Sequence, residues 1–292
     1  MSSPSRGRRK KHSLPPVAPT SLEAMDWAAL PHDILFAVFL KLGPREIMRG
    51  ADLACTAWRR VAVDEPKLWS CVDMGTVRQW STGRWRATAR TAVDRAAGQC
   101  EAFSGPCDDD LLLYLVERAP SLKSLHISHL DESKLVLNVA LLKKLPLLED
   151  VEISLEYYSD YASQELFESI CEACPHLKKL RMSFNVSLDC NYDDDMDSYD
   201  GKTYAIPVMC ELRSLELLCY HLTAAGLTAI LDNCPLLESL NVSGGFIIMM
   251  DEELHAKCAR VKNLTLPFDS DEEYSEEYDL EEGYESDEYD EF

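Results

Sequence analysis

The chain has 292 residues, of which 46% are hydrophobic, and its formal net charge is −22 from 51 acidic and 29 basic side chains. This length suits about two domains, and the apolar content excludes a wholly disordered chain. The acidic balance argues against nucleic-acid binding, because contact with phosphates needs a basic surface. Apolar runs stay shorter than about 18 residues, so we expect no membrane-spanning helix.

Residues 1–25 form a polar N-terminus that we expect to be disordered. It contains the basic cluster Arg8-Arg9-Lys10-Lys11, which is typical of a nuclear import signal but also arises by chance in disordered tails. The eleven cysteines are an odd number without the spacing of a small disulfide-bonded domain. We therefore expect reduced thiols and a location in the nucleus, the cytoplasm or both.

Residues 26–74 predict three short helices. The first has apolar side chains every four residues and a second apolar stripe beside them, at Leu30, Ile34, Val38 and Leu42, and at Leu35 and Phe39. Gly43-Pro44 ends it. A second helix runs from Arg45 to about Leu53, and a third includes Trp58. Such a small unit holds more apolar surface than it can bury, so Phe36, Phe39 and Ile47 are candidates for docking, or else pack on the rest of the chain.

The motif in this module resembles an F-box. It reads Leu30-Pro31-x-Asp33-Ile34-Leu35, then Cys55-x-x-Trp58-Arg59, then Leu68-Trp69. The resemblance implies docking on the Skp-type adaptor of a cullin–RING ubiquitin ligase. The residues implied in adaptor contact or in helix packing, two roles that the sequence does not separate, are Leu30, Pro31, Ile34, Leu35, Val38, Phe39, Leu42, Trp58, Leu68 and Trp69.

Residues 108–268 repeat one pattern, leucine-x-x-leucine-x-apolar. Its six copies begin at Leu122, Leu148, Leu177, Leu212, Leu237 and Val261. Each follows a helix-like apolar stretch, and four copies have a proline two residues earlier, which stops the helix. A strand then alternates, with Leu125 and Ile127 pointing inward and His126 outward. Because one unit cannot bury its apolar face alone, we expect the units to stack into a solenoid.

These copies resemble leucine-rich repeats of the longer, helix-containing type, so the chain resembles the plant F-box/leucine-rich-repeat class. The expected fold is α+β by parts, with a three-helix F-box at 26–74 and an α/β repeat solenoid at 108–268. Residues 75–107 would form a linker in which a degenerate first repeat begins at Ala97 and ends at Ala102.

The outward strand positions form one column on the concave face of the predicted solenoid. Its members are His126, Glu152, Arg181, Glu216, Asn241 and Thr265. Neighbouring strands would place them about 4.8 Å apart. A mixed-charge concave face is where a solenoid binds a partner, and the resemblance implies a protein substrate. For any single residue, an ordinary solvated surface position is the alternative.

Acidic residues gather in two further segments. The loop 189–204 includes Asp193, Asp195 and Asp197, which alternate like calcium ligands but lack the glycine and glutamate of an EF-hand. We therefore expect a solvated loop and no metal. Residues 269–292 hold fourteen acidic and no basic side chains, which predicts a disordered tail that either solubilises the protein or clasps a basic partner. Cys171-x-x-Cys174 predicts two packed thiols at a helix end.

The sequence contains no nucleophile elbow, no phosphate-binding glycine loop and no His-Glu-x-x-His. We therefore expect a non-catalytic protein without a cofactor. The resemblance implies the substrate-recognition subunit of an SCF-type ubiquitin ligase. From the acidic charge and the short apolar runs we expect no nucleic-acid or membrane partner. Two alternatives remain open, which are an acidic-tailed, histone-binding repeat chaperone and a repeat scaffold independent of any ligase.

Overall fold

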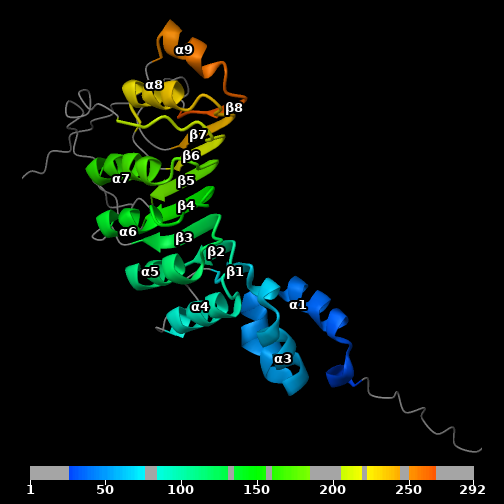
Figure 1. The fold of residues 1–292 in the computed structure, drawn as a ribbon. Coiled ribbons are helices and arrows are strands. Elements are labelled where there is room, and N and C mark those ends of the chain that lie inside the picture. The colour runs from blue at the N-terminus through cyan, green and yellow to red at the C-terminus, as the bar shows by residue number, and fades with distance from the viewer. Residues whose placement is uncertain are drawn as a thin grey trace, which may run out of the picture.

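The computed structural model describes residues 26–75, 84–130, 135–155, 160–184, 205–218, 222–243 and 250–267. The predicted basic N-terminus, acidic loop and acidic tail lie outside these ranges, as does the calcium-like aspartate series. Two parts are seen, a cluster of short helices and one parallel sheet with helices along one side (Figure 1). Within the described ranges, every helix is too short or too polar to cross a membrane.

The N-terminal module contains the three helical segments that the sequence predicts. Its elements are η1 (Trp27–Ala29), α1 (His32–Glu46), η2 (Ile47–Ala51), α2 (Asp52–Ala54), α3 (Thr56–Asp64) and η3 (Pro66–Trp69). The second predicted helix is irregular, with a wide π-type turn followed by one short α-helical turn. The sequence pattern marks this segment as helical but does not reveal the widening.

Gly43 breaks α1 into two parts. Its φ of 77° and ψ of 165° are not helical, and helical hydrogen bonding resumes directly after it. A positive φ is tolerated by glycine because it has no Cβ atom. Pro44 then suits a new first turn, since its ring fixes φ near the helical value. The predicted helix end at this dipeptide is therefore confirmed as a sharp kink.

The described residues after η3 form one eight-stranded parallel sheet with its helices, and the strands follow each other in chain order. The strands are β1 (Cys71–Asp73), β2 (Ala102–Gly105), β3 (Ser124–Leu130), β4 (Asp150–Leu155), β5 (Lys179–Phe184), β6 (Ser214–Leu218), β7 (Ser239–Ser243) and β8 (Asn263–Thr265). The connecting helices are α4 (Arg84–Arg95), α5 (Asp109–Arg118), α6 (Leu135–Leu142), α7 (Asp160–Ala173), α8 (Ala224–Asn233) and α9 (Glu252–Cys258). These helices lie on one side of the sheet and leave the other side uncovered (Figure 1).

Strand alternation places the repeat leucines in the core between the sheet and its helices. Leu125 and Ile127 are buried while His126 between them is partly exposed, as the pattern predicts. The first leucine of each copy, such as Leu122, is buried as well. The six predicted copies are therefore confirmed as strands β3 to β8.

The degenerate first repeat is present, but the predicted position is wrong by three residues. Phe103, not Cys100, pairs with Leu125, so the strand is 102–105. The pattern is hidden because Gly105 (φ 143°) occupies an inward position. A Cβ atom there would lie 2.6 Å from Cβ of Met74, which fills the space instead.

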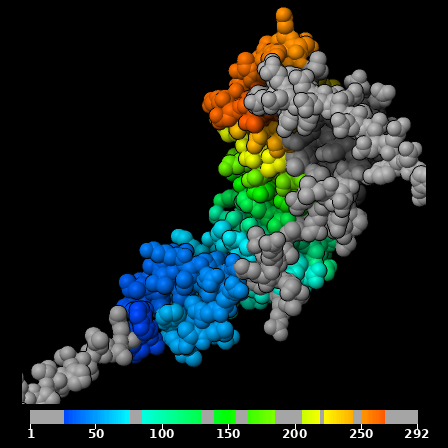
Figure 2. Space-filling model, turned by 180° about the vertical axis from the view of Figure 1, so that it is seen from behind, coloured from blue at the N-terminus to red at the C-terminus, as the bar shows by residue number. Residues whose placement is uncertain are grey.

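The N-terminal module shares a strand with the sheet. β1 follows η3 directly and pairs in parallel with β2, with Val72 opposite Phe103. The fully buried Trp69 donates from Nε1 to the carbonyl oxygen of Ala62 at 2.8 Å. The Arg95 guanidinium of α4 lies over the Trp69 ring, 4.8 Å from its centroid. The module therefore packs directly against the first repeats as one continuous body (Figure 2).

Candidate functional site

The N-terminal module exposes an unusual amount of apolar surface for its size. Of eleven exposed large hydrophobic side chains in the described ranges, seven lie between residues 27 and 63. They are Trp27, Ile34, Val38, Leu40, Leu42, Leu53 and Val63. Exposed apolar residues gathered in one small module are typical of a protein-binding surface, whereas the same residues scattered singly would need no explanation.

Helix α1 carries two apolar stripes with different surroundings. Leu35 and Phe39 are 2% and 0% exposed and belong to the core. The other stripe, Ile34, Val38 and Leu42, has its residues four positions apart, and these side chains are 40–47% exposed. The structure thus separates the two roles that the sequence leaves together, because only the second stripe is free to touch another protein. We call Ile34, Val38 and Leu42 the α1 stripe.

The remaining residues of the F-box-like motif divide in the same way. Leu68 and Trp69 are buried, Leu30 and Trp58 are partly exposed, and Pro31 is exposed. These placements assign packing to the two buried side chains and leave the others within reach of a partner.

Two predicted docking residues are in the core. Phe39 and Ile47 are both 0% exposed. The alternative that they pack on the rest of the chain is therefore correct. Phe36 is half-buried. Phe39 meets the Trp58 ring edge to face, with centroids 5.7 Å apart and ring planes at 72°. Trp58 in turn donates from Nε1 to the carbonyl oxygen of Trp27 at 2.8 Å. Buried aromatic contacts of this kind hold α1 and α3 together.

Four exposed apolar residues of the module were not among the predicted contacts. Trp27, Leu40, Leu53 and Val63 lie off the four-residue stripe and off the motif. Their exposure follows from how the short helices turn against one another, which the sequence pattern does not encode. Trp27 alone carried a signal, because a tryptophan at the very start of a module is a frequent interface residue.

The uncovered face of the sheet brings the six predicted column residues into one row. Strand register pairs His126 with Glu152, Glu152 with Arg181, Arg181 with Glu216, Glu216 with Asn241, and Asn241 with Thr265. Asp73 and Ser104 extend the row into β1 and β2. These two were missed because the first repeats do not show the leucine pattern. We call this row the strand-face row.

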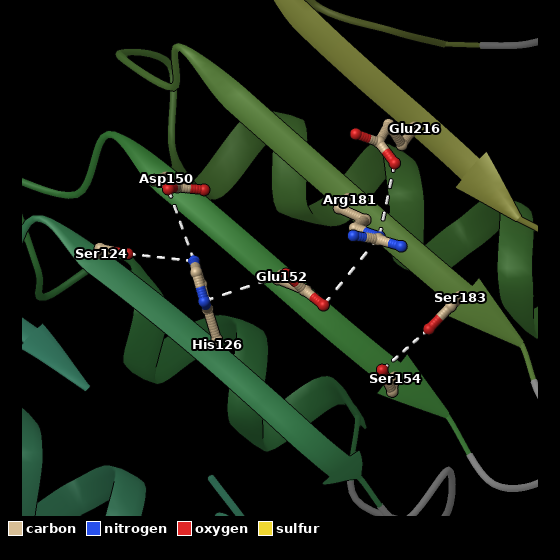
Figure 3. A network of polar contacts seen from close by, with 8 residues as sticks. All are labelled: Ser124, His126, Asp150, Glu152, Ser154, Arg181, Ser183 and Glu216. Atoms are coloured by element: carbon tan, nitrogen blue, oxygen red, sulfur yellow. Dashed lines mark hydrogen bonds and ion pairs between the residues drawn. The ribbon is translucent and has the colours of Figure 1, made fainter. Parts of the chain in front are cut away.

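Polar contacts link the first half of the row (Figure 3). His126 Nε2 lies 3.1 Å from Ser124 Oγ and 3.4 Å from Asp150 Oδ2, and its Nδ1 lies 3.9 Å from Glu152 Oε2. Arg181 Nε lies between two carboxylates, 4.0 Å from Glu152 Oε1 and 3.4 Å from Glu216 Oε2. Three carboxylates on β4 and β6 therefore share contacts with one guanidinium and one imidazole, which leaves negative charge in excess.

The second half of the row is open. The side chains of Asn241 and Thr265 make no hydrogen bond within the part of the chain that the structure describes. The ion pairs of the first half join side chains that are about one-third to one-half exposed. Exposed pairs contribute about 0–1 kcal/mol each, so a partner could replace them at small cost. The row can thus exchange its own polar contacts for those of a bound protein.

A second charged row runs along the start of the strands. Its pairs are Lys123–Glu101 at 3.4 Å, Lys178–Glu149 at 2.9 Å, Arg213–Glu238 at 2.6 Å and Lys262–Glu238 at 2.9 Å. Hydrogen bonds from Lys262 and Arg213 lower the pKa of the Glu238 carboxyl. Because each charge joins neighbouring repeats, we assign this row to repeat alignment and not to binding.

The Cys171-x-x-Cys174 pair lies at the end of α7 with both thiols buried, which confirms the packed-thiol interpretation. Burial raises the pKa of Cys174 to about 11 and raises that of Cys171 as well. Such thiols are poor nucleophiles and poor metal ligands at neutral pH. Among the described residues, no group of three or more His, Cys, Asp or Glu side chains is placed to hold a metal ion.

Comparison with known proteins finds both parts of the chain in one class. A family model described as F-box-like matches residues 27–74. The chain is 33% identical over 279 residues to F-box/LRR-repeat protein 22 of Arabidopsis thaliana, covering 90% of this chain and 86% of that one. It is 30% identical over 265 residues to F-box protein SKIP19 of the same plant, covering 88% and 82%. F-box/LRR-repeat protein 21 is 29% identical over 268 residues, covering 86% and 85%.

Proposed function

The chain belongs to the F-box/LRR-repeat protein family, and on that premise we propose that it is a substrate-recognition subunit of an SCF-type cullin–RING ubiquitin ligase. In this role the N-terminal module docks on a Skp-type adaptor and the strand face holds a protein substrate. The observation that carries the proposal is the α1 stripe, three apolar side chains 40–47% exposed on a helix that matches the F-box motif.

The proposed adaptor contact centres on the α1 stripe, with Leu30 and Pro31 before it. An amphipathic helix whose second apolar face is free fits a hydrophobic groove on a partner, with anchors spaced four residues apart. Leu35 and Phe39 support this contact indirectly, because they fix α1 against the core. One apolar side of α1 thus packs on the core and the other would contact the adaptor, which is why this helix has apolar residues on two sides.

The proposed substrate contact is the strand-face row. It combines carboxylates, a guanidinium, an imidazole and an amide on a rigid sheet, which is suited to recognising a polar protein surface by matching charges. No bond is made or broken by the receptor in this proposal. It raises the effective concentration of substrate lysines near a ubiquitin-charged enzyme by holding both in one assembly.

A pull-down tests the adaptor contact. We expect the tagged full-length chain to capture a recombinant Skp-type adaptor. The double variant Ile34→Asp/Val38→Asp should lose at least about tenfold in capture, since two apolar side chains that the adaptor would cover become charged. Leu113→Asp is the matched control, because Leu113 is 43% exposed on α5, outside the module. Circular dichroism of each variant checks that the fold is retained.

The competing functions predict different results. Equal capture by the wild type and the double variant would exclude the α1 stripe as the docking surface. Capture of histones with no adaptor, followed by mass spectrometry of bound proteins from cell extract, would favour the acidic chaperone. Capture of neither would favour the independent scaffold. Loss of an extract protein on Arg181→Glu, with the adaptor retained, is the result expected for a substrate held on the strand face.

We also propose a location in the nucleus, the cytoplasm or both. The support is the basic cluster Arg8–Lys11 together with the free state of the cysteines in the described ranges. Fluorescence microscopy of the tagged chain, with and without a change of these four residues to alanine, separates nuclear import from simple diffusion.

A further inference from the structure

A cavity of about 330 Å³ lies where the N-terminal module meets the first repeat helix. Residues 45–52 form one wall and α4 forms the other. The lining residues are Arg45, Met48, Arg49 and Asp52 from the first wall, and Ala87, Thr88, Thr91 and Arg95 from the second. Each set follows helical spacing, so two helical surfaces flank the space, which is open to solvent. We call it the junction cavity.

The junction cavity is positively charged. Three of its lining side chains are arginines and one is an aspartate. The aspartate is already paired, with Asp52 Oδ2 at 3.0 Å from Arg95 Nη2. In the described part of the chain, no carboxylate forms an ion pair with Arg45 or Arg49. The guanidinium groups of Arg45 and Arg49, which line the cavity, therefore have no carboxylate paired with them among the described residues.

Buried polar atoms of the lining residues also lack partners. Arg45 Nε, Arg95 Nη1 and Asp52 Oδ1 make no hydrogen bond among the described residues, although all three atoms are buried and Asp52 is only 7% exposed. Buried polar groups in folded proteins are almost always paired. Two donors and one acceptor are thus left without a partner among the described residues, at atoms that solvent does not reach. The charges of the lining arginines, and not these atoms, therefore define the ligand.

We propose that the junction cavity binds a phosphate group, held by Arg45, Arg49 and Arg95 and bridging the N-terminal module to α4. Guanidinium groups match phosphate oxygens in charge and in fork geometry. The inference stands apart from the proposed ligase role, since it concerns a different surface from the α1 stripe.

The ligand class follows from this chemistry, and its source is either a free phosphate compound or a phosphorylated side chain of a partner. In both cases the bound group would contact both walls of the cavity. It would therefore stabilise the joint between module and repeats and raise the thermal midpoint of the chain, because the ligand binds the folded state alone.

Calorimetry on the full-length chain tests the proposal. We expect inorganic phosphate, titrated in chloride buffer at neutral pH, to bind to the chain. Arg49→Ala should weaken phosphate binding by about tenfold or more, because the loss of one hydrogen bond to a charged group changes an affinity by at least about that factor. Arg49 is exposed, so this change leaves the core intact. Arg60→Ala, an exposed arginine of α3 away from the cavity, is the charge-matched control.

Three results would overturn the assignment. They are the absence of phosphate binding at millimolar concentration, equal weakening by Arg49→Ala and Arg60→Ala, and an equal rise of the thermal midpoint with phosphate in the wild type and in Arg49→Ala. Phosphate should also raise the thermal midpoint of the wild type and not that of Arg49→Ala. A parallel titration with N-acetyl-phosphoserine amide identifies the source, because tighter binding than inorganic phosphate indicates a phosphorylated side chain and weaker binding indicates a free compound.

Discussion

At the scale of single residues, position on α1 decides between packing and contact. Leu35 and Val38 are both aliphatic and three residues apart, yet one is 2% exposed and the other 40%. The sequence predicted both stripes and their spacing correctly. It did not predict which stripe faces the core, because that depends on where α3 and η3 pack, and their contacts are long-range.

Truncation of these two residues should therefore give different losses of stability. Leu35→Ala should lower the free energy of unfolding by about 2–5 kcal/mol, since it leaves a cavity in the core. Val38→Ala should change it by less than about 1 kcal/mol, because the side chain is largely in solvent. Urea unfolding of the full-length chain measures both, and equal losses would contradict the assignment of the two stripes.

At the scale of elements, the repeat pattern was a reliable guide wherever leucine fills the inward positions. Strands β3 to β8 and helices such as α5 and α8 are found where the pattern predicts them. The pattern failed at β1 and β2, where Trp69 and Cys100 take the place of the first leucine and Gly105 takes that of the last apolar residue. A sequence rule based on leucine cannot detect a repeat whose core is filled by a neighbour, as Met74 does here.

Alternation within a strand gives a test on two adjacent residues. In β6, Leu215 is fully buried and Glu216 lies on the strand-face row. Leu215→Ala should cost about 2–5 kcal/mol in unfolding free energy. Glu216→Ala should cost less than about 1 kcal/mol, because it removes only one exposed ion pair with Arg181. A larger loss for Glu216→Ala than for Leu215→Ala would be inconsistent with the observed register.

At the scale of the whole molecule, the N-terminal module and the repeats pack against each other at β1, β2 and α4. Three contacts cross the joint, which are the β1–β2 pairing, the Arg95–Trp69 stack and the Arg95–Asp52 ion pair, whose side chains are only 15% and 8% exposed. A linker with a degenerate first repeat was the expectation for residues 75–107, and α4 and β2 lie within this range. Length and composition cannot reveal such sharing of a strand.

Cooperative unfolding of the two parts should follow. All five tryptophans lie between residues 27 and 85, so their fluorescence reports the module and the first repeat, whereas far-ultraviolet circular dichroism reports the whole chain. We expect the two signals to give one coincident urea transition. Arg95→Ala should move both midpoints to lower urea together, since it removes a contact between the parts. Two separate transitions would show that the joint does not couple them.

The shared strand also sets a rule for protein engineering. Gly105 and Met74 are matched to each other across β1 and β2, with no room for a larger residue at the glycine. A chimaera that grafts this module onto foreign repeats at residue 75 would separate the pair and present β1 to a strand not shaped for it. A chimaera joined after β2 would keep Met74 and Gly105 together.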